Sequence, residues 1–176
     1  APTGHLLQDG RVIVIGGSAL RQLPLTSVEV YDVAADTWTE VAPMATERWR
    51  HGSVIFEDGR IMVVAGEKAD LVLVAEAEIY DPVADAWSGA GTLAEARALH
   101  TVTLLSDGRV LVVGGGKRES PYLKTAEIYD PATGEWTLAA PTQVAHSAHT
   151  ATVLQDGRVL ITGGKGKVTL AEIYDP

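Results

Sequence analysis

The sequence of 176 residues contains neither cysteine nor asparagine. Without cysteine the chain can form no disulfide, no thiolate metal site and no cysteine nucleophile. Without asparagine it carries no acceptor for N-glycosylation. Hydrophobic residues make up 46% of the chain and charged residues 21%, which is the balance of a chain that can bury a core. We therefore expect a globular protein.

Long apolar runs and basic clusters are also missing. No stretch approaches 18 uninterrupted apolar residues, and the N-terminus lacks a basic segment followed by an apolar run. We therefore expect neither a membrane span nor an uncleaved signal peptide, and no membrane partner. The net charge of −9 argues against a general nucleic-acid binder, because phosphate binding needs a clustered basic surface.

The dominant feature of the sequence is an internal repeat. Its markers recur every 49 residues, except for a step of 45 residues between the last two Tyr-Asp pairs. They are Asp-Gly-Arg at Asp9, Asp58, Asp107 and Asp156, Tyr-Asp at Tyr31, Tyr80, Tyr129 and Tyr174, and tryptophan at Trp38, Trp87 and Trp136. A fixed period of about 50 residues is typical of propeller arrays, whose repeats cannot bury their apolar faces alone. Function is then expected where the repeats differ.

Each repeat divides into four strand-like segments. In the third repeat these are residues 100–105, 110–115, 126–129 and 136–139. The Asp-Gly turn predicts that the first two segments form an antiparallel hairpin, because both residues tolerate a positive φ. The second segments are almost continuously apolar, at residues 12–15, 61–64, 110–113 and 159–161. Such runs are expected of strands buried on both faces.

Paired glycines, Tyr-Asp-Pro and the spaced tryptophans complete the pattern, as at residues 114–115, 129–131 and 136. Over essentially its whole length the chain resembles the kelch motif, in its bacterial form with Asp-Gly-Arg in the first hairpin. The resemblance implies an all-β propeller with about four four-stranded antiparallel blades, at residues 1–49, 50–98, 99–147 and 148–176. Tyrosine and tryptophan are expected to pack between blades, with their O–H and N–H groups bonded at the edge.

The two ends of the repeat array also carry an expectation. The sequence begins at the first segment of one repeat and stops after the third segment of another, so the last blade lacks its outer strand. An open arc would expose apolar blade faces at both ends. We predict a two-fold homodimer whose half-rings complete an eight-bladed ring, because closed symmetry covers both ends. The alternative is a fragment of a longer propeller.

Chain direction places the loops on two faces. The Asp-Gly-Arg turns and the turns between third and fourth strands share one face, which is rich in aspartate and predicted to be acidic. The opposite face carries the variable loops at residues 18–27, 67–75, 116–125 and 165–169, together with the connections between blades. Its charges predict a positive excess that attracts an anionic ligand or an acidic partner. The alternative is that these charges are merely solvated.

The candidate contact site lies on this variable face. Trp49 and Tyr122 break the repeat pattern, and tryptophan, tyrosine and arginine are enriched in binding hot spots. The predicted ligand-binding residues are Arg48, Trp49, Arg50, Arg97, Lys117, Arg118 and Tyr122. Trp49 could instead fill a gap between blades.

Histidine recurs at His51, His100 and His149, one repeat position at the start of an innermost strand. This recurrence favours a structural role, such as a hydrogen bond to the adjacent blade. A metal-binding pair of His146 and His149 is disfavoured, because an odd separation on a strand points the side chains to opposite faces. No metal and no cofactor are expected.

Three functions compete. The first is a non-catalytic scaffold that binds a protein or a carbohydrate through its variable loops. The second is an enzyme acting on acidic sugars through Arg50, His51, Arg97 and His100, although no motif singles these out. Similarity to copper-radical oxidases of this fold is excluded, because they need a cysteine cross-linked to tyrosine. The third is a self-associating half-ring.

Overall fold

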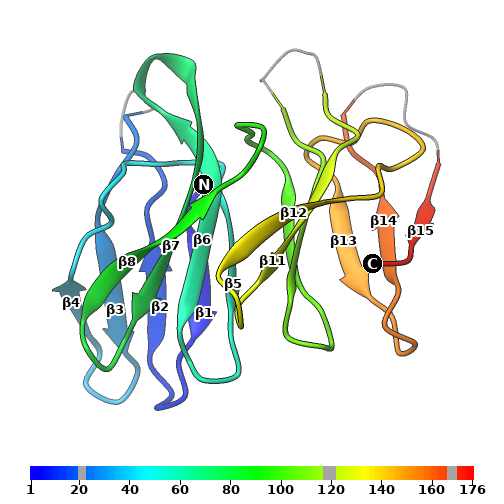
Figure 1. The fold of residues 1–176 in the computed structure, drawn as a ribbon. Helices are drawn as coiled ribbons and strands as arrows, with labels where there is room; N and C mark the ends of the chain where they lie inside the picture. The colour runs from blue at the N-terminus through cyan, green and yellow to red at the C-terminus, as the bar shows by residue number, and fades with distance from the viewer. Residues whose placement is uncertain (20–22, 117–121, 166–169) are drawn as a thin grey trace.

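Four antiparallel sheets follow one another along the chain (Figure 1). The computed structural model describes residues 1–19, 23–116, 122–165 and 170–176. The first sheet holds β1 (Thr3–Leu6), β2 (Val12–Ile15), β3 (Val28–Asp32) and β4 (Thr37–Val41). The second holds β5 (Gly52–Ile55), β6 (Ile61–Lys68), β7 (Val72–Asp81) and β8 (Ala86–Thr92). The third holds β9 (Thr101–Leu104), β10 (Val110–Val113), β11 (Ala126–Asp130) and β12 (Glu135–Ala139), and the fourth holds β13 (Thr150–Val153), β14 (Val159–Thr162) and β15 (Glu172–Tyr174).

Within each sheet, strands adjacent in sequence are also adjacent in space. The first strands of neighbouring sheets contact one another in the order β1, β5, β9 and β13, so the sheets stand side by side as blades around a common axis (Figure 1). The all-β blade architecture predicted from the repeat is therefore confirmed. Among the described residues, no helix is long and apolar enough to cross a membrane.

The Asp-Gly-Arg motif closes the first hairpin of every blade. In the first blade, the Arg11 backbone N–H donates to Asp9 Oδ1 at 3.0 Å, and the Arg11 side chain donates to Asp9 Oδ2 at 2.8 Å. Gly10 has a φ of 88°, a value that glycine adopts without steric cost. The carboxylate thus fixes both the turn and its arginine, which explains why the three residues recur together.

The hydrophobic core lies between blades and not within them. Between the second and third blades, Met62 and Val64 pack with Val110 and Val112, and none of the four has exposed surface. Equivalent clusters fill the first and third junctions. Burying one such side chain contributes about 1.5–3 kcal/mol, so each junction stabilises the two sheets that form it.

The repeated aromatic side chains tie neighbouring blades together. Trp87 Nε1 donates to the carbonyl of Ala42 at 2.7 Å, and Trp136 Nε1 donates to that of Ala90 at 2.8 Å, in each case on the preceding blade. The Tyr174 hydroxyl donates to the carbonyl of Ala140 in the same way. The expected packing between blades, with polar bonds at the edge, is confirmed for these three residues.

The two terminal blades each keep one side uncovered within the described chain. All four residues of β10 are buried, whereas burial alternates along β2 and β14. The first-blade outer face consists of Leu6, Val12, Val14, Tyr31 and Trp38, and the fourth-blade outer face consists of Leu154, Leu160, Thr162 and Ile173. Trp38 is 56% exposed, although Trp136 at the same repeat position is bonded to a neighbouring blade.

The second blade departs from the repeat above its core. Here β6 and β7 continue as a hairpin through a 3₁₀ turn at Ala69–Leu71, after a bulge between Val64 and Gly66. Residues 67–75, predicted as a loop, are therefore mostly strand. The β-branched residues Val72 and Val74 favour extension, and Glu67 pairs with Trp49 on the connection that leads into this blade.

Candidate functional site

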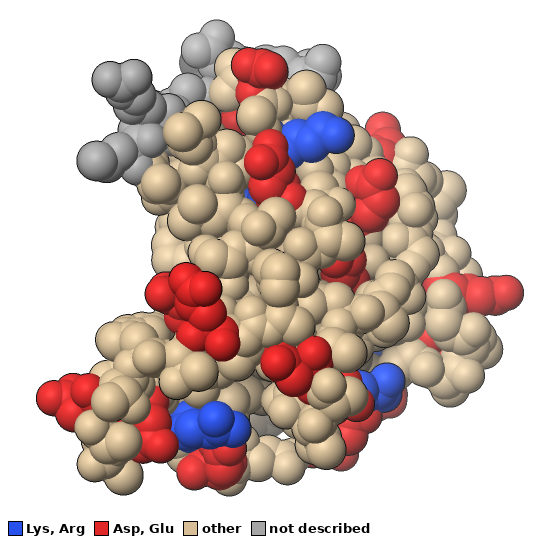
Figure 2. Space-filling model, turned by 90° about the vertical axis from the view of Figure 1, so that its left-hand side faces the viewer, with Lys and Arg blue, Asp and Glu red and all other residues tan. Residues whose placement is uncertain are grey.

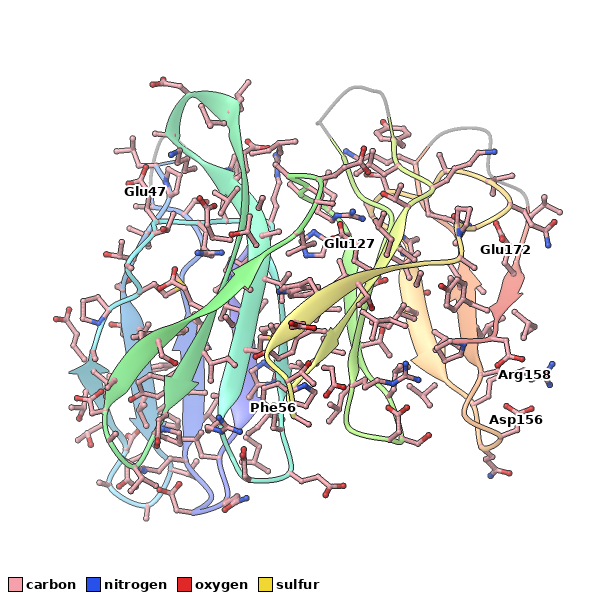
Figure 3. All side chains as sticks on the ribbon, viewed as in Figure 1. Glu47, Phe56, Glu127, Asp156, Arg158 and Glu172 are labelled. Carbon is pink, nitrogen blue, oxygen red and sulfur yellow. The ribbon has the colours of Figure 1, made fainter. Side chains whose placement is uncertain are left out.

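The loops lie at two ends of the blades, as chain direction predicts. The Asp-Gly-Arg turns and the turns between third and fourth strands lie at the lower end in Figure 1, here called the bottom face. The connections between second and third strands and between blades lie at the upper end, the top face. Figure 3 shows Asp156 and Arg158 at the lower end of the fourth blade, and Glu127 and Glu172 nearer the upper ends of their strands.

A buried side-chain contact anchors each described connection between blades, and two of the three contacts are arginine–glutamate ion pairs. One repeat position in these connections carries Arg48, Arg97 or His146, and its side chain meets a glutamate on the third strand of the next blade. The contacts are Arg48 Nη2 to Glu78 Oε1 at 2.5 Å, Arg97 Nη2 to Glu127 Oε1 at 2.6 Å and His146 Nε2 to Glu172 Oε1 at 2.9 Å. We call this arrangement the connection latch.

The latch also bonds to backbone groups at the strand ends. Arg97 Nη1 donates to the carbonyls of Gly114 and Thr125 at 3.0 and 3.1 Å, and Glu127 Oε2 accepts from the Ala94 N–H at 2.8 Å. Desolvation lowers the pKa of the Arg97 guanidinium, and the Glu127 charge opposes that shift. The network therefore holds the connection against the ends of two strands.

Two predicted contact residues belong to this latch. Arg48 and Arg97 are both 0% exposed, so they present no guanidinium group to a ligand, and the prediction for them is corrected. Sequence reasoning missed their partners, although a signal was present. Glu78, Glu127 and Glu172 each precede the repeated tyrosine by two residues and recur in step with the latch position.

Two of the three recurring histidines bond to the preceding blade, which confirms the structural role predicted for those two. His51 Nε2 lies 3.0 Å from Thr3 Oγ1, and His149 Nε2 lies 2.9 Å from Thr101 Oγ1. Desolvation lowers the pKa of each of these histidines to about 4, with smaller contributions from Arg48 near His51 and from His146 near His149. Both rings are therefore neutral at pH 7.

His100 occupies the same position without a partner. The equivalent of the threonine is Gly52, where a Cβ atom would lie 2.2 Å from Val102 Cγ2. Both ring nitrogens of His100 lack a hydrogen-bond partner among the described residues, and burial lowers the pKa of the ring to about 3. The space taken by Val102 thus excludes the hydroxyl that the other two histidines use.

Trp49, Arg50 and Glu67 form a compact group on the top face. Arg50 stacks on the Trp49 ring, with its guanidinium carbon 4.0 Å from the ring centroid. Arg50 Nη1 donates to Glu67 Oε2 at 3.3 Å, and the backbones of Trp49 and Glu67 exchange hydrogen bonds of 3.0 and 2.9 Å. Cation–π contact and ion pairing therefore hold the arginine in place.

This group breaks the repeat at two facing positions. The equivalents of Trp49 and Glu67 are Ala98 and Gly116, which form the same isolated bridge. Trp49 belongs to none of the three hydrophobic clusters between the described blades, so its indole does not fill a junction core. Because the fold accepts alanine and glycine at the next blade, the large side chains here are not required by blade packing.

A pocket of about 250 Å³ adjoins this group. It is lined by Leu23, Pro24, Trp49, Glu67, Lys68, Ala69, Asp70 and Leu71. Tyr122, half-buried on the third blade, pairs with Gly116 and is not among these residues. Lys117 and Arg118 lie outside the described residues. Of the predicted contact residues that the structure describes, only Trp49 and Arg50 come together in this group.

The top face is less positive than predicted where it is described. Arg48, Arg50 and Arg97 are each paired with a glutamate, which cancels their charge. On the bottom face, each arginine of the hairpin turns pairs with the aspartate of its own turn. Figure 2 shows acidic side chains spread over the side that carries β4 and β8. Among the described residues, no cluster of three potential metal ligands exists.

The latch yields a prediction about stability. Replacing Arg97 with alanine leaves Glu127 buried without its cation, so we expect the free energy of unfolding to fall by about 3–5 kcal/mol. Arg109→Ala breaks the exposed pair with Asp107 and should change the free energy of unfolding little. Urea denaturation of both variants measures the difference. Equal losses would mean that the latch does not anchor the connection.

The buried histidines predict a pH dependence. Their pKa rises on unfolding from about 4 towards the ordinary value near 6.5, so the unfolded chain binds more protons below pH 6.5. The contribution of the neutral histidines to the free energy of unfolding is fully present above that pH. It falls as the pH drops towards 4, by up to about 1.4 kcal/mol per pH unit for each ring. Urea denaturation measures the free energy of unfolding at pH 7 and at pH 5. The difference between the two values should be smaller for the His51→Gln, His149→Gln double variant than for the unmodified protein. An unchanged difference would contradict this assignment.

Comparison with known proteins agrees with the blade architecture. The family model of the kelch motif matches residues 1–45 and 97–143, which together are just over half of the chain. No curated protein matches the sequence. The matched segments cover the first and third blades, including their Asp-Gly-Arg turns and tryptophans. The chain belongs to the kelch-repeat family.

Proposed function

We propose that this chain is a non-catalytic β-propeller scaffold that binds a protein or carbohydrate ligand on its top face and self-associates as a half-ring. The observation that carries the binding proposal is the group of Trp49, Arg50 and Glu67. These side chains border a pocket at positions where the following repeat has only Ala98 and Gly116. Large side chains that the repeat fold does not need, placed next to a pocket, support a binding role.

The alternative of an enzyme acting on acidic sugars has less support. It needs cationic or titratable groups at the mouth of the channel, namely Arg50, His51, Arg97 and His100. Arg97 is fully buried in the connection latch, and the two histidines are at most 8% exposed and neutral at pH 7. Only Arg50 keeps an exposed portion, and Glu67 already neutralises it.

Self-association is supported by the chemistry of the two outer faces. In the third blade, Leu104, Val112 and Trp136 pack towards the second blade, and Leu111 and Ile128 pack towards the fourth. The first-blade outer face carries Leu6, Val14 and Trp38, which are the equivalents of Leu104, Val112 and Trp136. The fourth-blade outer face carries Leu160 and Ile173, which are the equivalents of Leu111 and Ile128. The two faces of one chain are therefore the two halves of a junction that the molecule already builds three times.

A second copy is the proposed occupant of both faces. Joining the first-blade outer face of one copy to the fourth-blade outer face of the other, twice, gives a two-fold dimer in which each junction resembles an internal one. Leu6 and Ile173 are 67% and 48% exposed, so their burial there would remove apolar surface from water. Eight blades would then surround a common axis.

The binding proposal predicts losses on a ligand array. Glycan and protein arrays probed with Trp49→Ala and Arg50→Ala should show signals weakened by about tenfold or more, because both residues are placed at the proposed contact. Leu138→Ala, at an exposed position on the outer strand of the third blade, is the matched control. Binding that is the same for all three variants would exclude the site.

The dimer proposal predicts a concentration-dependent mass. Light scattering at micromolar concentrations should give twice the chain mass of 18.6 kDa. Leu6→Glu and Ile173→Glu place an unpaired charge at the proposed junctions and should return the protein to a monomer. Val83→Glu, at a position 95% exposed in a bottom-face turn, should leave the dimer intact. A folded, strictly monomeric unmodified chain would contradict the proposal.

A further inference from the structure

Two residues that line the top-face pocket each carry a buried polar atom without a hydrogen-bond partner among the described residues. The two atoms are Trp49 Nε1, which can only donate, and Glu67 Oε1, which as a carboxylate oxygen can only accept. Trp49 is 7% exposed and Glu67 is 1% exposed, and both residues line the pocket. Buried polar groups are nearly always paired, so these two atoms call for a partner that supplies one acceptor and one donor.

Arg50 already contacts another part of each side chain. Glu67 Oε2 accepts from Arg50 at 3.3 Å, and the Trp49 ring carries the Arg50 guanidinium on one face at 4.0 Å. The hydrogen-bonding groups without a described partner are therefore the indole N–H and one carboxylate oxygen. The N–H edge of the indole is the polar part of Trp49 that can recognise a ligand.

We infer that the pocket binds a neutral saccharide, held by hydroxyl groups that accept from Trp49 Nε1 and donate to Glu67 Oε1. This inference rests on the proposed top-face binding function and specifies its ligand class. A hydroxyl group can both donate and accept, and neighbouring hydroxyls on a sugar ring present both roles at short spacing. Leu23, Pro24 and Leu71 supply the apolar lining that the C–H face of a sugar contacts.

Charge around the pocket favours a neutral sugar over an acidic one. The two acidic residues that line it are Glu67, which pairs with Arg50, and Asp70. Lys68 is the basic residue of the lining. With Arg50 counted, charges of the two signs balance, so the site offers no net attraction to a carboxylate. The carboxylate oxygen Glu67 Oε1 moreover repels an anionic group placed against it.

Size and access set further limits. The space of about 250 Å³ lies just below the range of ~300–1,000 Å³ that drug-sized ligands use, so one sugar ring is the expected occupant. The two unpartnered atoms have almost no solvent contact, so ligand entry requires the rim side chains to change rotamer. Leu23 and Leu71 are each 58% exposed and are free to do so.

Titration of the indole N–H resonances tests this inference. The protein, labelled with ¹⁵N-tryptophan, is titrated with methyl β-glucoside, methyl β-galactoside and methyl α-mannoside, and Trp49→Phe identifies the Trp49 signal. At least one glycoside should shift that signal and saturate at millimolar concentration. Tetrahydropyran, which lacks hydroxyls, should not shift it, and glucuronate should bind no more tightly than its neutral counterpart.

Two conservative variants separate recognition from folding. Trp49→Phe keeps the aromatic ring and removes the N–H, and should weaken glycoside binding by about three- to tenfold, measured by calorimetry. Glu67→Gln removes the charge and should weaken it by about tenfold or more. Circular dichroism should report unchanged folding for both, because the third blade forms the same bridge with Ala98 and Gly116.

The outcomes are distinct. The saccharide inference fails if no neutral glycoside moves the Trp49 signal, if glucuronate binds more tightly, or if both variants bind as well as the unmodified protein. Should the glycosides fail while a protein on the array still depends on Trp49, only the ligand class is overturned and the binding function stands. If substitution of Trp49 changes no binding on the array, both the ligand class and the proposed binding function are overturned.

Discussion

The structure depends on one constraint, which is that each blade has two apolar faces and cannot cover either of them. The second strand shows this most directly. Val110 and Val112 point to one neighbouring blade and Leu111 and Val113 to the other, and all four are fully buried. The same strand in the first and fourth blades is only half covered. Stacking blade on blade is therefore what makes each sheet stable, and the axis, the two loop faces and the outer faces all follow from it.

Stacking alone does not determine how the chain passes from one blade to the next. The connection latch does so, by placing Arg97 or its equivalent under the connection and against a glutamate on the following blade. Because such a pair is costly to desolvate, its arginine also donates to carbonyl groups at the strand ends. The top-face loops thus rise from an ordered base, which is the situation in which loops and hairpins carry binding groups.

Departures from the repeat have two different physical meanings in this molecule. Gly52 replaces a threonine because Val102 occupies the space that a Cβ would need, and His100 loses its bond as a result. That departure is a packing accommodation. Trp49 and Glu67 replace nothing that the fold requires, since Ala98 and Gly116 make the same bridge in the third blade. Each carries a buried polar atom with no partner among the described residues, and both line a pocket, which is the basis of the proposed site.

The local structure could be predicted from the sequence, because turns and strand periodicity are local signals. The Asp-Gly-Arg turns, the apolar runs such as residues 110–113 and the 49-residue period predict hairpins, buried strands and blades without reference to distant contacts. They also place Trp49 as a residue outside the repeat. Which charged groups are free to meet a ligand depends on contacts between distant residues, which the sequence pattern does not show. Arg48, Trp49 and Arg50 are consecutive in sequence, yet Arg48 is sealed in the latch by Glu78, thirty residues away, while Arg50 turns towards Glu67 on the top face. Burial and ion pairing depend on which strands meet in space, and the spacing of residues along one chain segment does not contain that information.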